Sequence, residues 1–273
     1  MFGSITRRGF LGLAPAVPLA ALSTRLTPSQ QTVTPDTATG PAPATRFPAH
    51  DPDIVKEIVT VAHGNLARVK ELVSARPALA RTSWDWGFGD WESPIDAASH
   101  VGNRPIAEYL IANGARPTIY TAAMMGQLAI VRGWVESVPG VQRNRGPHGI
   151  TLLAHARNGG AAAADVLKYL ESLGDADPRY TDLPVSDADQ SAIVGDYAFG
   201  SGATERLKVG KNTRGTLVIQ RSGQGERGLS HQGGLAFIPA GAEAVRVRFD
   251  VTGGKARTLM VEDGAMIVRA ERI

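Results

Sequence analysis

Six histidines are the side chains best suited to hold a metal ion or to move protons: His50, His63, His100, His148, His155 and His231. No two of them are four residues apart, the spacing that places two metal ligands on one face of a helix. His63 and His100 stand just before Gly64 and Gly102, so a shared position in one groove is conceivable. We favour helix ends for both, where the negative end of the helix dipole stabilises the imidazole. The histidines alone therefore predict no metal site.

Three carboxylates, those of Asp85, Asp90 and Glu92, lie close together in a segment rich in tryptophan. Carboxylate oxygens are ligands that calcium prefers, but these three do not follow the fixed register of a calcium loop. The chain also has no cysteine, which excludes disulfides, thiolate zinc sites, iron–sulfur clusters and cysteine nucleophiles. We therefore expect neither a metal nor a cofactor.

A glycine-rich run from Gly223 to Gly228 matches the dinucleotide-binding pattern Gly-x-Gly-x-x-Gly. That pattern works only where a helix begins and aims its N-terminus at the pyrophosphate. Residues 229–234 cannot begin a helix, so we assign the run to a hairpin loop. The chain also has no Gly-x-Ser-x-Gly elbow, no Ser-x-x-Lys pair and no phosphate-binding Lys-Ser/Thr loop. Without a catalytic constellation, a non-catalytic protein is favoured.

The composition is that of a folded chain. Hydrophobic residues make up 43% and charged residues 20% of the 273 positions, which excludes a mostly disordered chain and a multi-span membrane protein. The 29 basic and 26 acidic residues are scattered, so nucleic acid is not an expected partner. The length suits two domains.

The N-terminus has the pattern of an export signal. Arg7 and Arg8 are followed, after one residue, by Phe10 and Leu11, and residues 9–22 carry no charge. This arrangement resembles the bacterial twin-arginine translocation signal. The uncharged stretch is shorter than the roughly 20 apolar residues that a spanning helix needs. A flexible N-terminus with a chance arginine pair is the alternative.

We accordingly expect residues 1–23 to be a signal peptide and the mature protein to be periplasmic or secreted, without spanning the membrane. Residues 24–50 contain 12 prolines and threonines in 27 positions and few apolar side chains. Such a segment cannot repay the entropy of ordering, so we expect a disordered linker.

Residues 51–178 show self-similar units in which a glycine is followed by an amphipathic helix. We expect each helix to bury one apolar stripe, formed by Val69, Leu72 and Val73, by Ile106, Leu110 and Ile111, and by Ile130, Val131, Trp134 and Val135. The second unit begins with Ser93 and Pro94, continues through Ala97 and Ala98 to Gly102, and closes at residues 113–115, Asn-Gly-Ala. This unit resembles the ankyrin repeat. Ser93 is suited to cap the first helix, and Pro94 tolerates its first position because no N–H is needed there. The resemblance implies a stack of helix pairs that binds a protein or peptide.

The repeat spacing departs from the ankyrin pattern. Gly64, Gly102, Gly126 and Gly160 are separated by 38, 24 and 34 residues, whereas the repeat has a period of about 33. The first unit lacks the Thr-Pro opening, and the fourth starts without proline. A generic helical bundle is the alternative.

The longest step contains an insertion at residues 83–92 that carries three of the four tryptophans of the chain. We select Trp84, Trp86, Phe88 and Trp91 as candidate binding residues, because loop aromatics supply large contact areas at low entropic cost. In the alternative, the tryptophans fold back over the first repeat as a lid.

Beyond residue 178 the period changes from helical to alternating. Val245, Val247, Phe249 and Val251 alternate with charged residues, and Gly-Gly and Asp-Gly pairs supply turns. Residues 183–273 therefore predict a separate β domain, a small antiparallel barrel or half-barrel. Its short motifs, such as residues 195–197, Gly-Asp-Tyr, resemble the lipocalin-like domain appended to β-lactamase-type serine hydrolases. The resemblance implies no catalytic residue here.

Two functions remain open. The first is an exported, non-catalytic module that uses an ankyrin-like surface and the aromatic loop to bind another protein or peptide. The second is an envelope enzyme or small-ligand binder that uses the β domain as its pocket. A barrel interior lined with polar groups favours the second, and a filled apolar core leaves the first.

Overall fold

The computed structural model describes residues 49–273. The predicted signal peptide, with Arg7, Arg8, Phe10 and Leu11, lies outside the described residues, as does nearly all of the predicted linker. Within the described part, no helix has both the length and the apolar character needed to cross a membrane.

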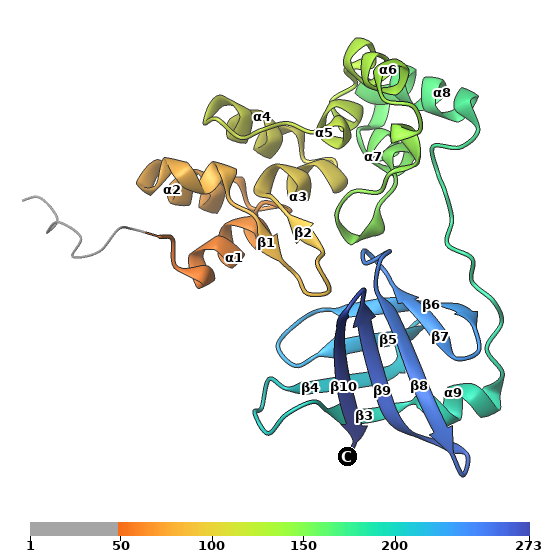
Figure 1. Cartoon of the computed structure of the whole chain (residues 1–273). Coiled ribbons are helices and arrows are strands. Elements are labelled where there is room, and N and C mark those ends of the chain that lie inside the picture. The colour runs from red at the N-terminus through yellow and green to blue at the C-terminus, as the bar shows by residue number, and fades with distance from the viewer. Residues whose placement is uncertain (1–48) are drawn as a thin grey trace, which may run out of the picture. The chain divides into compact units, whose positions relative to one another are not determined.

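Helices fill the first half of the described chain and are arranged in consecutive pairs (Figure 1). The pairs are α1 (Pro52–Val61) with α2 (Leu66–Ala75), α3 (Pro94–His100) with α4 (Arg104–Ala112), α5 (Ile119–Met124) with α6 (Leu128–Ser137), and α7 (Leu152–Asn158) with α8 (Ala164–Leu173). The first helices of the pairs contact one another in the order α1, α3, α5, α7. Among the second helices, α2 contacts α4 and α6 contacts α8.

The helix boundaries follow from capping and glycine geometry. Ser93 and Asp96 form a capping box at the start of α3, with Pro94 in its first turn. Gly102, after α3, has φ +75°, and a Cβ there would collide with the backbone oxygen of Asn158 in α7. Only glycine fits this turn, because it tolerates both the left-handed conformation and the close approach of the neighbouring helix.

Most, but not all, of the predicted apolar stripes are buried. Val69, Leu72 and Val73 of α2 lie in the core, as predicted. In α6 only Val131 is fully buried, whereas Ile130 and Trp134 are about half exposed. The predicted stripe of α6 is therefore wider than the face that this helix packs against its neighbours.

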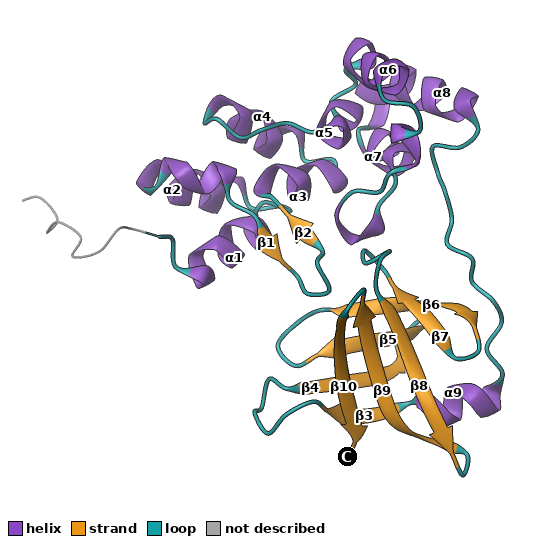
Figure 2. Cartoon of the chain, viewed as in Figure 1, coloured by secondary structure: helices purple, strands orange, loops and turns teal. Residues whose placement is uncertain are grey.

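A short β-hairpin follows the first helix pair. Its strands are β1 (Trp84–Asp85) and β2 (Trp91–Glu92), with Trp84 paired to Glu92 and Asp85 paired to Trp91. The tip turns through positive φ angles at Gly87, Phe88 and Gly89. The inserted segment predicted at residues 83–92 thus has regular structure (Figure 2).

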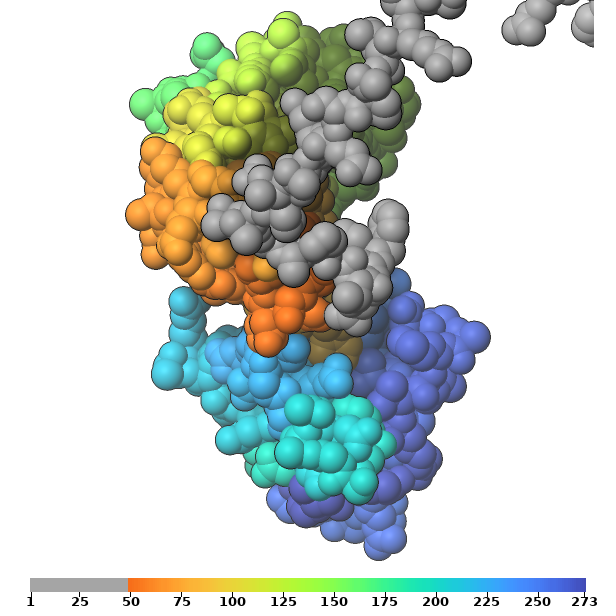
Figure 3. All heavy atoms as spheres, turned by 90° about the vertical axis from the view of Figure 1, so that its left-hand side faces the viewer, coloured from red at the N-terminus to blue at the C-terminus, as the bar shows by residue number. Residues whose placement is uncertain are grey.

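The remainder of the chain forms a closed antiparallel barrel. Residues 174–186 lead to α9 (Asp187–Ile193), and the barrel strands are β3 (Gly195–Ala198), β4 (Arg206–Lys211), β5 (Leu217–Arg221), β6 (Glu226–Gly233), β7 (Ala236–Pro239), β8 (Arg246–Thr252), β9 (Lys255–Asp263) and β10 (Met266–Arg272). Each strand pairs with the next along the chain, and β10 closes the barrel against β3. The prediction of a helical region followed by a small antiparallel barrel is confirmed. In the space-filling view of Figure 3, the orange to green surface belongs to the helices and the cyan to blue surface to the barrel.

The barrel interior is filled by its own side chains. Val247 and Phe249 of β8 are buried while Arg248 and Asp250 are exposed, so the predicted alternation is confirmed. Tyr197, Phe237 and other apolar side chains occupy the centre. Of the two interiors considered from the sequence, the structure has the filled apolar one.

One barrel strand was not predicted. The run assigned to a hairpin loop contains a tight turn near Gly223 and then continues as β6 from Glu226. Alternate residues of β6, Arg227, Leu229 and His231, are buried. The loop assignment is therefore wrong for residues 226–228, which belong to β6. It failed because only Arg227, Leu229 and His231 show the alternation of a strand, and the glycines between and around them lack side chains that would reveal it.

Candidate metal centre

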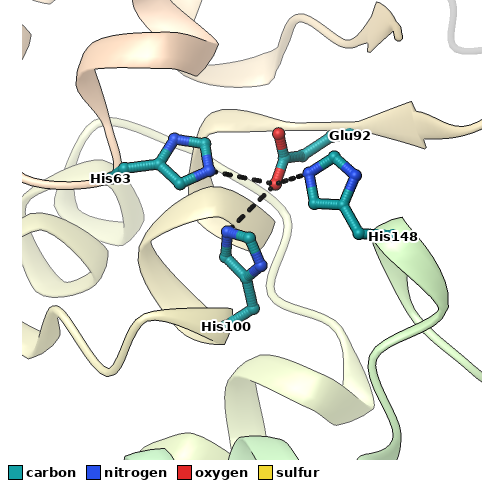
Figure 4. Close-up of side chains that lie close together, drawn as sticks. All are labelled: His63, Glu92, His100 and His148. Atoms are coloured by element: carbon teal, nitrogen blue, oxygen red, sulfur yellow. Dashed lines mark ion pairs between the residues drawn. The ribbon is translucent and has the colours of Figure 1, made fainter. Parts of the chain in front are cut away.

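Four potential metal ligands converge in the helical part of the chain: His63, Glu92, His100 and His148 (Figure 4). One donor atom from each lies within 4.8 Å of the others. They come from four places in the fold: the turn after α1, strand β2, the last residue of α3, and a short 3₁₀ turn at Pro147–Gly149. Each is therefore positioned by a different element.

The three distances that meet at Glu92 suit a small tetrahedral metal site, whereas the four donor atoms as a set lie within 4.8 Å of one another. The Nε2 atoms of His63, His100 and His148 lie 3.7, 3.4 and 3.3 Å from Oε1 of Glu92. Ligands placed about 2.0–2.1 Å from a tetrahedral zinc ion are separated from one another by about 3.3 Å. The edges that meet at Glu92 thus differ from this value by a few tenths of an ångström at most.

His63 has its free ring nitrogen directed at the cluster. Helix α1 has its C-cap at Ala62, and the Nδ1 atom of His63 lies 3.0 Å from the carbonyl oxygen of Thr60 and 3.2 Å from that of Val59. A carbonyl oxygen only accepts hydrogen bonds, so this geometry assigns the proton to Nδ1 and leaves the lone pair on Nε2. The helix end predicted for His63 is thus also what orients it as a ligand.

His148 is held by a carboxylate behind it. Its Nδ1 atom lies 2.7 Å from Oδ2 of Asp90, and its backbone N–H donates a 2.8 Å hydrogen bond to Oδ1. Arg227 donates a further hydrogen bond of 2.8 Å to the same Asp90 Oδ2. Metal-binding histidines characteristically donate their second ring N–H to a carboxylate or carbonyl, which fixes the ring and raises its basicity.

Glu92 is fully buried and only half satisfied. Its Oε2 atom accepts a 2.7 Å hydrogen bond from the indole N–H of Trp86. Within residues 49–273, its Oε1 atom has no hydrogen-bond partner, and neither ring nitrogen of the buried His100 has one. A buried carboxylate oxygen without a donor is costly unless a charge compensates it. A cation bound at this point would satisfy Oε1 of Glu92 and the Nε2 atom of His100, and would leave Nδ1 of His100 without a partner among the described residues.

The protonation of the cluster follows from burial and charge. Burial lowers the pKa of His100 to about 4, so this imidazole is neutral at neutral pH. Burial also acts against a charge on His148, but the hydrogen bond from its Nδ1–H to Asp90 and the nearby charges of Glu92 and Asp90 outweigh it and raise the pKa of His148 to about 9. Burial acts to raise the pKa of Asp90, and the hydrogen bonds from His148 together with the charge of Arg227 lower it overall. Without a metal, therefore, His100 is neutral and His148 is protonated at neutral pH, and a metal ion has to displace the Nε2 proton of His148 in order to bind there.

The four predicted binding aromatics are separated by the fold. Trp84 and Trp86 pack against the core of the helical segment, and Phe88 packs against the core of the barrel. Trp91 is 61% exposed. The structure therefore brings Trp86 to the metal cluster and leaves Trp91 as the one of the four that is mainly in contact with solvent.

The acidic residues of the same segment also separate. Glu92 is a member of the cluster and Asp90 supports His148, while Asp85 accepts a hydrogen bond from the backbone N–H of Gly87 at the hairpin tip. The three carboxylates considered as calcium ligands do not form one site.

Sequence reasoning assigned no metal-ligand role to any of the four: helix ends were favoured for His63 and His100, and Glu92 was considered only as a calcium ligand. One sequence signal could have predicted that His63 and His100 lie close together. Both stand just before the glycine of their unit, and stacked units bring equivalent positions side by side. No sequence spacing connects His148 or Glu92 to them.

Comparisons with known proteins leave the chain without an assigned family. No family model and no curated protein matches it. Among solved structures, a crystal structure of SurE aligns with 44% of this chain at 21% identity and a TM-score of 0.24. The aligned region spans 28% of that protein, and so low a TM-score carries no argument about fold or function.

Proposed function

We propose that this protein binds one zinc ion through His63, Glu92, His100 and His148. The observation that carries the proposal is the buried Oε1 atom of Glu92, which has no hydrogen-bond donor and faces three imidazole Nε2 atoms within 3.7 Å. Two of those imidazoles have their other ring nitrogen next to an acceptor, as metal-binding histidines do.

The donor set favours zinc over other ions. Calcium and magnesium take mainly oxygen ligands, and magnesium needs six of them, whereas this cluster offers three nitrogens and one oxygen. Three imidazoles with one carboxylate in four-coordinate spacing suit zinc, which has no geometric preference beyond the tetrahedron it adopts in structural sites.

Four protein ligands complete the tetrahedron around the zinc ion and leave no position for water or substrate. Zinc sites of this kind are structural, whereas catalytic zinc sites keep one position open. The bound ion would join the turn after α1, the hairpin, the end of α3 and the 3₁₀ turn. A stabilising role is consistent with the absence of a catalytic motif from the sequence.

We further propose that the zinc-stabilised helix pairs are divergent ankyrin-type repeats that bind another protein or peptide. The order of contacts along the first helices, the capping box at Ser93 and the hairpin after the first pair support this. The pattern of Arg7 and Arg8 supports export to the periplasm. The filled interior of the barrel disfavours a binding pocket inside it.

The test is a zinc titration of the untagged, metal-free full chain against a competing chelator, with native mass spectrometry for stoichiometry. We expect one zinc per chain, and a loss of affinity of at least a hundredfold in His100→Ala and in the isosteric Glu92→Gln. His50→Ala, which removes a histidine outside the cluster, is the control and should bind as the wild type does. Absence of stoichiometric zinc, or unchanged affinity in both ligand variants, contradicts the proposal.

A further inference from the structure

A cavity of about 210 Å³ lies at one mouth of the barrel. Its apolar walls are formed by Phe88, Phe199, Leu207, Val261, Met266 and Val268. The barrel residues among them lie in or beside the β3–β4 and β9–β10 connections, which share one end of an up-and-down barrel. The cavity thus adjoins the end of the filled barrel core, to which Leu207 and Val261 belong.

The tip of the hairpin forms one wall of this cavity. Phe88 packs against the core of the barrel, and the guanidinium of Arg227 lies 5.7 Å from the centre of its ring. Phe88 has φ +59°, a left-handed conformation that is strained for a bulky side chain. Strain of this kind persists where the surrounding structure enforces it, and it concentrates at ligand-binding sites.

Unpaired polar groups line the same cavity. The guanidinium of Arg221 lies 5.6 Å from the ring centre of Phe199 and donates one long hydrogen bond, of 3.4 Å, to the Thr204 carbonyl. Within residues 49–273 Arg221 forms no ion pair, whereas Arg227 is paired with Asp90. The side-chain oxygen of Gln224 is buried without a hydrogen-bond partner.

We infer that this cavity binds a small carboxylate with an apolar tail. The carboxylate pairs with Arg221, and a water molecule that accompanies it can donate to Gln224. The tail lies among Phe88, Val261 and Val268. Because an apolar cavity of about 150 Å³ is enough for a benzene molecule, this cavity of about 210 Å³ has room for the tail of a medium-chain or single-ring acid.

The experiment measures binding of sodium octanoate to the full chain by isothermal titration calorimetry, with octanol as the uncharged probe. We expect saturable binding of one octanoate per chain and at least fivefold weaker binding of octanol. Val268→Phe fills the cavity and should weaken octanoate binding at least tenfold. The matched control is Ile267→Phe, the same substitution at the next residue of β10, whose side chain is 60% exposed and outside the cavity.

Arg221→Gln provides a second test in case Val268→Phe does not fold. Arg221 is on the surface, so its replacement leaves the barrel core intact. We expect it to weaken octanoate binding at least fivefold and to leave octanol binding unchanged. No saturable octanoate binding to the wild type, or wild-type affinity in a folded Val268→Phe and in Arg221→Gln, overturns the inference. The titrations are made without added metal, so their outcome is independent of the zinc proposal.

Discussion

The indole N–H of Trp86 donates a 2.7 Å hydrogen bond to Oε2 of Glu92, and this bond leaves Oε1 to face the three imidazoles. Trp84, two residues earlier, packs against the same helical core, but its indole N–H is buried without a partner. The two tryptophans thus have similar surroundings and opposite hydrogen-bonding states.

Trp86→Phe should destabilise the metal-free protein by about 1–3 kcal/mol more than Trp84→Phe does. Both substitutions remove similar volume, but only the first deprives a buried carboxylate of its donor. The measurement is the free energy of unfolding in urea for both variants. Equal losses would show that the hydrogen bond to Glu92 contributes nothing to stability.

Asp90→Asn should lower zinc affinity about 10–100-fold, because the carboxylate behind His148 fixes the ring and raises its basicity. Asp85→Asn, in the same hairpin and bonded to the backbone of Gly87, is the control. Zinc titration of each variant, after circular dichroism confirms folding, provides the measurement. Indistinguishable affinities in the two variants would remove Asp90 from the centre.

Zinc should stabilise the folded chain by about 2.7 kcal/mol at a free concentration of a hundred times its dissociation constant. For a chain of this size that corresponds to a rise in melting temperature of roughly 5–10 °C. Thermal scans with zinc, and with excess chelator, measure the shift. Glu92→Gln should show almost no shift, and a full shift in this variant would place the stabilising zinc elsewhere.

The barrel could be predicted because each strand shows its alternation of buried and exposed residues within a few positions of the sequence. Val247 and Phe249 face one side and Arg248 and Asp250 the other, as in any strand with one buried face. The helix pairs were predictable for the same reason, since caps such as that at Ser93 and the stripes of α2 are encoded within a few residues. Of the barrel strands, only β6 was not predicted, because glycines interrupt its alternation; the hairpin strands β1 and β2 and helix α9 were not predicted either.

The candidate metal centre could not be predicted in this way. Its ligands stand on four elements, and no local spacing relates Glu92 in the hairpin to His148 in a later turn. Their meeting depends on how the helix pairs stack, and on Phe88 and Asp90 contacting the barrel, which are long-range contacts. The spacing of residues along one helix face cannot predict such contacts between distant parts of the chain.

Trp91→Ala should leave the free energy of unfolding within about 0.5 kcal/mol of the wild type, because the side chain is mostly exposed. If Trp91 is the partner-binding residue of the hairpin, its truncation costs about 2 kcal/mol or more of binding. Trp84→Ala, by contrast, should lower stability. Partner capture and urea unfolding on both variants separate the roles, and undiminished capture by Trp91→Ala would remove Trp91 from the interface.

Replacing Arg7 and Arg8 together by lysine should retain the precursor in the cytoplasm, since the twin-arginine pathway that the motif resembles requires that pair. Cell fractionation and immunodetection measure the distribution. Arg25→Lys, a basic residue outside the pair, is the control. Normal delivery of the double variant would contradict the assignment of the export signal.

The spread of the four ligands along the chain sets an order of events during synthesis. His63, Glu92 and His100 leave the ribosome first, and His148 follows His100 by 48 residues. At about 5–20 residues per second, the nascent chain carries three donors for roughly 2–10 s before the fourth becomes available. An ion captured in that interval is held by an incomplete set of ligands and exchanges readily. If zinc binds as proposed, tight retention begins only when the 3₁₀ turn carrying His148 folds against the hairpin. Zinc retention by stalled chains of increasing length would then report when this half of the protein becomes native.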